Sequence, residues 1–130
     1  MMNRPLKMFA LVSMISILLT CYALADSKIG WVPITGNEYN MIVYGHIDVE
    51  DLDFEKGEYL LFSFGPSGDK DCRSMSRVKQ DGLFYSTICG DIPGEVLTFK
   101  VINPISQEVY EMESIIVFEP DSTIEDLYLE

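Results

Sequence analysis

Apolar and polar residues alternate along much of the chain after residue 38. In the segment 39–49, Met41, Val43 and Ile47 fall on one face, and His46 falls on the other. A period of two is typical of a β-strand that is buried on one face only. The same alternation recurs in the segments 96–102 and 108–118, and the segment 83–89 is rich in the aromatic and β-branched residues that strands favour. Each of these segments is therefore predicted to be a β-strand.

Turn-forming residues separate these segments at short intervals, and segments with a less clear strand pattern lie between them. The segment 58–65 places Leu60, Phe62 and Phe64 on one side. Segment 72–79 and a last short strand with Ile124, Leu127 and Leu129 complete a set of six or seven short strands, and no long segment has a helical period. This pattern predicts an all-β fold, an antiparallel sandwich of two sheets with an immunoglobulin-like arrangement.

The first 25 residues have a different character from the rest of the chain. Two basic residues, Arg4 and Lys7, precede the apolar run 8–19, and small residues at positions 23 and 25 follow it. This order is typical of a secretory signal peptide. We expect a signal-peptide helix over 1–25 and a single β-sandwich domain over 26–130.

Two other interpretations of this segment remain open. The run from Met8 to Ala25 is about long enough to span a membrane if it is tilted. Cys21 is a candidate for lipid attachment, although Thr20 is a poor residue directly before such a cysteine. Cleavage after Ala25 is favoured, which predicts a secreted or periplasmic protein without a membrane span.

The chain is strongly acidic. It contains 21 acidic and 9 basic residues, and its formal net charge is −12. The acids are interspersed with apolar residues, which is typical of a solvated surface rather than of a disordered tail. Such a domain should repel nucleic acids and anionic lipids, and it should be attracted to a basic partner.

Two cysteines lie in the predicted domain, at the outer ends of the segment 72–89. A turn centred between Gln80 and Asp81 would place Cys72 directly opposite Cys89, near the separation that a disulfide needs. A turn centred on Asp81 and Gly82 would offset the cysteines by two positions. Cysteines in exported domains usually pair, so we expect a structural disulfide between Cys72 and Cys89.

Several stretches of the chain resemble a recurring module of large secreted and surface-attached bacterial proteins. They are "WVP" at 31–33, "YNMIV" at 39–43, "DCR" at 71–73, "LFYSTICGDIPGEVLTFKV" at 83–101 and "EVYE" at 108–111. The resemblance implies a β-sandwich accessory unit without an assigned reaction, and it implies no functional residues. It does not extend to Cys89, where an aromatic residue is expected, so the disulfide depends on the hairpin alone.

Exposed aromatic residues can form a platform for carbohydrate, because the ring face stacks on sugar C–H groups while the polar edge stays hydrated. The candidates for such a platform are Trp31, Tyr39, Tyr44 and Tyr85. Packing in the core or at its rim would also explain these residues.

Acidic residues crowd two predicted loops, and hard oxygen donors on loops are what calcium requires. The candidate ligands are Asp48, Glu50, Asp51 and Asp53 in the first loop, and Asp69 and Asp71 in the second. Neither loop has EF-hand spacing. Solvated surface acids are therefore the favoured interpretation, and no cofactor is expected.

Catalytic groups are scarce in the sequence. His46 is the only histidine and lies at a polar position of the first strand, so a surface histidine is expected there. Without a second histidine a standard triad is hard to assemble. We expect a non-catalytic exported module that binds a glycan, a cell-envelope component or a partner protein. The alternative is an acidic structural or inhibitory protein that acts on a basic target such as a cell-wall hydrolase.

Overall fold

The computed structural model describes residues 30–130. Contacts divide the chain into two units, Met1–Trp31 and Val32–Glu130, and the strands found within residues 30–130 all belong to the second unit. The predicted signal peptide over 1–25, with Cys21, lies outside the described residues. Over residues 30–130 no helix is long and apolar enough to cross a membrane.

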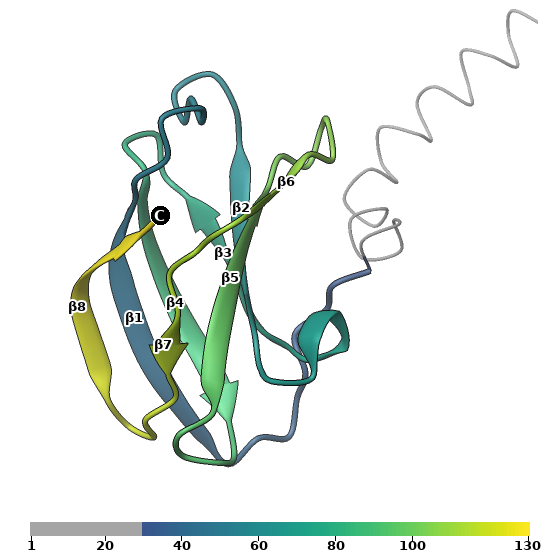
Figure 1. The fold of residues 1–130 in the computed structure, drawn as a ribbon, viewed down its shortest axis with the longest axis vertical. Coiled ribbons are helices and arrows are strands. Elements are labelled where there is room, and N and C mark those ends of the chain that lie inside the picture. Colours follow the sequence, from purple (N-terminus) through teal and green to yellow (C-terminus); the bar gives the residue numbers. More distant parts are fainter. Residues whose placement is uncertain (1–29) are drawn as a thin grey trace, which may run out of the picture. The chain divides into compact units, whose positions relative to one another are not determined.

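Eight strands build the second unit, and they form two packed sheets (Figure 1). The three-stranded sheet has the order β4-β1-β8, and the five-stranded sheet has the order β3-β2-β5-β6, with β7 paired to β5. The strands are β1 (Tyr39–Ile47), β2 (Tyr59–Phe64), β3 (Cys72–Val78), β4 (Leu83–Gly90), β5 (Val96–Ile102), β6 (Val109–Glu111), β7 (Ile116–Val117) and β8 (Thr123–Leu129), and a short 3-10 turn, η1 (Gly68–Lys70), precedes β3. The predicted all-β fold with two stacked sheets is confirmed.

Two details differ from the sequence-based expectation. The segment 108–118 is not one strand but two, β6 and β7, because the amides of Glu113 and Ser114 bond to the carbonyl of Glu130 instead of continuing the ladder. In addition, β8 runs parallel to β1, whereas every other pair of strands is antiparallel.

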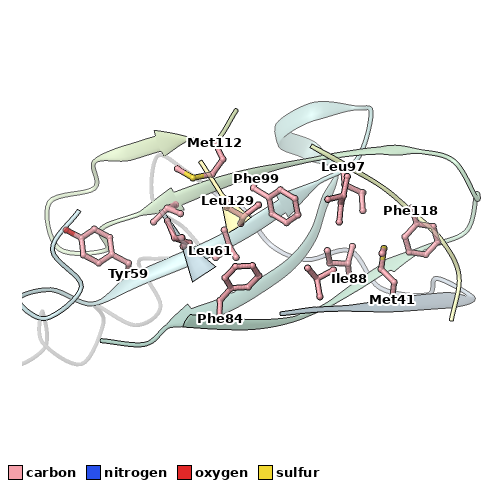
Figure 2. Packing of buried hydrophobic residues seen from close by; sticks show 14 of the residues in the cluster. Met41, Tyr59, Leu61, Phe84, Ile88, Leu97, Phe99, Met112, Phe118 and Leu129 are labelled. Atoms are coloured by element: carbon pink, nitrogen blue, oxygen red, sulfur yellow. The ribbon is translucent and has the colours of Figure 1, made fainter. Parts of the chain in front are cut away.

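The core lies between the two sheets, and the alternation in the sequence identifies most of it (Figure 2). Met41 and Val43 of β1 and Leu97 of β5 are fully buried, as the pattern predicts. Strand β2 differs, because every one of its residues is buried. Tyr59 and Leu61 belong to the core cluster, so the opposite face of β2 carries the predicted apolar set Leu60, Phe62 and Phe64.

The connection between β3 and β4 carries the chain from one sheet to the other, since β3 pairs with β2 and β4 pairs with β1. The amide of Gly82 donates to the carbonyl of Lys79, and the amide of Lys79 donates to the carbonyl of Leu83. Gly82 has a φ of 83°. A three-residue loop of this kind is a tight turn followed by a left-handed residue, for which glycine is preferred.

This turn explains why the predicted disulfide is wrong. Residues of β3 and β4 that contact each other are spaced symmetrically about Asp81. The Ser76 and Ser86 hydroxyl oxygens lie 2.6 Å apart, and the Cys89 thiol donates to the carbonyl oxygen of Arg73 at 3.3 Å. Cys89 therefore faces Arg73, and a shift of one position sends the neighbouring side chain to the other face of a strand. The Cys72 and Cys89 thiols are both free.

Candidate binding site on the three-stranded sheet

The outer face of the three-stranded sheet carries aromatic side chains because of the strand period. On β1, Met41, Val43 and Ile47 fill the core, so Tyr44 and His46 lie on the opposite face. On β4, the buried and exposed residues alternate in the same way, and Tyr85 is 56% exposed.

Strand pairing brings these rings together in two pairs. Tyr44 faces Tyr85 on β4, and their ring centroids lie 6.1 Å apart with an interplanar angle of 18°. His46 faces Tyr128 on β8, with a centroid distance of 4.9 Å and an angle of 21°. The four rings thus extend from β4 across β1 to β8, and we call Tyr44, His46, Tyr85 and Tyr128 the aromatic face.

A β-bulge lies directly beside the aromatic face. Val43 pairs with Ile124 and Gly45 pairs with Leu127, so two residues of β8, Glu125 and Asp126, oppose the single residue Tyr44. Bulges of this kind redirect side chains and are frequent next to functional sites.

Two backbone features make the bulge possible. Asp126 has a φ of 55°, a left-handed conformation that aspartate adopts more readily than most residues. A side chain at position 45 would collide with the backbone of Leu127, so glycine is required where β8 approaches β1.

The bulge places a carboxylate against the aromatic face. A hydrogen bond between the Tyr44 hydroxyl and the Glu125 side chain raises the pKa of Tyr44, and the nearby charge of Asp126 acts in the same direction. Both acids are exposed. The three strands of this sheet contain no lysine or arginine. This face therefore combines stacked rings with uncompensated negative charge.

The structure separates the four predicted aromatic candidates. Tyr44 and Tyr85 meet in the aromatic face. Tyr39 stands at the start of β1, is 38% exposed and faces Gly90 instead of another ring. Trp31 is only 7% exposed, so its ring offers no free face. Tyr128 is not among the predicted candidates, although Leu127 and Leu129 on either side of it pack into the core and this alternation places Tyr128 on the outer face.

The predicted calcium ligands are not gathered into a site. Asp48, Glu50 and Asp51 are exposed, and Asp53 accepts the amide of Glu55. The remaining two candidates are paired with cations: Asp69 lies 2.6 Å from Lys100, and Asp71 lies 2.7 Å from Arg73. Within residues 30–130, no group of three or more His, Cys, Asp or Glu side chains is arranged to hold a metal ion.

A hollow of about 340 Å³ lies elsewhere in the second unit, and Asp71, Arg73 and Glu95 contribute to its lining. The Arg73 side chain is 6% exposed, and its guanidinium binds Asp71, Glu95 and the carbonyl of Cys89. The hydrogen bond from Arg73 lowers the pKa of Asp71. Because Arg73 is already neutralised by two carboxylates, this network is suited to holding loops together rather than to binding an anion.

No protein-family model matches the chain, and no curated protein matches it at a significant level.

Proposed function

We propose that the chain is an exported, non-catalytic module that binds a glycan on its aromatic face. The observation that carries this proposal is the row of four rings across β4, β1 and β8, with Tyr85 and Tyr128 each 56% exposed. A cluster of exposed rings is costly to leave in water and marks an interaction surface.

The chemistry of the aromatic face suits a sugar better than a purely apolar partner. Ring faces stack on sugar C–H groups, and the tyrosine hydroxyls and the histidine nitrogens remain available for sugar hydroxyls. The Glu125 carboxylate, beside Tyr44, adds a strong hydrogen-bond acceptor at the edge of the rings. A ligand with alternating apolar and polar surfaces satisfies both kinds of group.

Export and the lack of catalysis are parts of the same proposal. The composition of residues 1–25 supports export, which would bring the module to cell-surface glycans. His46, the only histidine of the chain, stacks on Tyr128 in the aromatic face. We assign it to ligand contact rather than to proton transfer.

A glycan array with matched variants tests this proposal. The purified chain should bind a subset of glycans, and Tyr85→Ala and Tyr44→Ala should each weaken that binding by about fivefold to tenfold, as expected for the loss of one stacking ring. Ile105→Ala is the control, because Ile105 is 85% exposed outside the aromatic face. An array without hits, or variants that bind as well as the parent, would contradict the proposal.

A second function is favoured by the acidic loop between β1 and β2. The acids Asp48, Glu50, Asp51 and Asp53 point to solvent, while Leu52 is buried and anchors the loop. Such a loop would steer the protein to a basic target, such as a cell-wall hydrolase, and inhibit it. The test is inhibition of a basic lysozyme at low salt. Unchanged lysozyme activity would exclude that target.

A further inference from the structure

We infer that the glycan bound on the aromatic face carries free, protonated amino groups. This inference rests on the proposed function and names the ligand class of the same site. It commits to a cationic amino sugar, in preference to a neutral N-acetylated sugar or an acidic sugar.

The distribution of charge between the two sheets is the first argument. Arg73 and Arg77 lie on β3 and Lys100 lies on β5, so the cationic side chains on strands belong to the five-stranded sheet. The strands of the three-stranded sheet carry only carboxylates as formal charges, Glu125 and Asp126. An anionic ligand would meet these acids without any lysine or arginine on the same strands to offset them.

The geometry of the bulge is the second argument. It sets both acids on the edge strand β8, directly opposite Tyr44 of the central strand β1, rather than in a distant loop. Because the bulge sets Glu125 opposite Tyr44, the carboxylate lies beside the ring on which a sugar would stack. A sugar placed on Tyr44 and Tyr85 therefore brings its substituents within reach of a fixed negative charge.

The rings themselves favour a cation. A protonated amine near the face of a tyrosine is attracted by the ring quadrupole, and this attraction adds to a salt bridge with a neighbouring carboxylate. Acetylation of the amine removes the charge and with it both interactions. The site is thus expected to distinguish an amino sugar from its N-acetylated form.

Calorimetric titration with two tetramers of the same backbone tests the inference. The β-1,4-linked glucosamine tetramer should bind about tenfold more tightly than the N-acetylglucosamine tetramer, a preference that corresponds to one favourable charge contact. Glu125→Gln should remove most of this preference, and added salt should weaken binding of the amino form only. Glu119→Gln is the control, because it makes the same charge change at an exposed residue outside the strands.

The outcomes separate the two proposals. Equal or tighter binding of the N-acetylated tetramer, with loss of binding in Tyr85→Ala, overturns the cationic ligand and leaves the glycan site standing. If neither tetramer binds and the glycan array has no hits, both proposals are overturned. If the parent chain is dimeric in solution and Tyr85→Ala is monomeric, with no glycan bound, the aromatic face is an interface between two copies, and both proposals are again overturned.

Discussion

The thiol of Cys89 faces the carbonyl oxygen of Arg73, at 3.3 Å, and not the thiol of Cys72. The Cys72 thiol instead lies 3.5 Å from the carbonyl oxygen of Ser74 on its own strand. A turn register that differed by one position would set the two cysteines opposite each other and allow a disulfide, whereas the observed register leaves both thiols free. The two cysteines thus report directly on the register of the β3–β4 turn.

We expect both thiols to remain free in the purified protein. Burial raises the pKa of Cys72 to about 11, so at neutral pH this thiol is protonated and should react slowly with iodoacetamide in the native state. After denaturation without reductant, peptide mapping should find both Cys72 and Cys89 alkylated. A peptide pair linked between these two residues would show that the turn register is different.

Replacing Arg73 with methionine should destabilise the protein strongly. The change leaves the carboxylates of Asp71 and Glu95, which are 13% and 14% exposed, without their cation. Loss of one partner from a buried ion pair costs about 3–5 kcal/mol in the free energy of unfolding, measured by urea denaturation.

Lys56→Gln is the matched control, because the Lys56 side chain is 86% exposed and its pair with Asp53 spans 3.8 Å. Exposed pairs of this kind contribute less than about 1 kcal/mol. If the two substitutions had similar effects, the Arg73 network would not be the buried contact described above.

Stability should fall in acid because of Asp71. The pKa of this carboxyl is lowered in the folded state from its ordinary value of 3.8, chiefly by the hydrogen bond from Arg73. The contribution is fully present well above pH 3.8 and is lost as the pH falls through the lower, folded-state pKa. Urea denaturation from pH 7 to pH 2 should show this loss, and Asp71→Asn should be less stable at pH 7 and lose less on acidification. An identical pH profile for both proteins would contradict the assignment.

The bulge predicts a coupling between Glu125 and Tyr44. In the parent chain the pKa of Tyr44 should lie above its ordinary value of 10.0, because its hydroxyl bonds to the Glu125 side chain. In Glu125→Gln the pKa of Tyr44 should move back toward that value, as followed by NMR of ring-labelled tyrosine. Glu119→Gln should leave it unchanged. If the pKa of Tyr44 were the same in the parent chain and in Glu125→Gln, the carboxylate would not lie against the aromatic face.

The strands themselves could be predicted from the sequence because burial on one face leaves a period of two. Met41 and Val43, and later Leu97 and Phe99, are buried as the alternation indicates. The sequence pattern places Leu60, Phe62 and Phe64 on one side of β2 but does not indicate which side meets the core, because both faces of this strand are buried. The crossing from one sheet to the other after β3 leaves no signal in the alternation, although Asp81-Gly82 is a favoured turn pair and Gly82 adopts a left-handed conformation.

The candidate site was only partly visible in the sequence. Tyr44 and Tyr85 were identified as aromatic candidates, but their contact depends on pairing between β1 and β4, which lie far apart in the chain. His46 was expected at the surface and lies half-buried against Tyr128. The bulge at Glu125 and Asp126 adds one residue to β8 between Ile124 and Leu127, which both pack against the core, so a period of two cannot place these two acids.

The most direct test of the account is a two-dimensional amide NMR titration with the glucosamine tetramer. We predict that the largest shift changes fall on the strand residues around Tyr44, Tyr85 and Tyr128, and that residues of β3 and β5 are nearly unaffected. Shift changes confined to the acidic loop 48–58, to the hollow near Arg73 or to the five-stranded sheet would contradict a glycan site on the aromatic face.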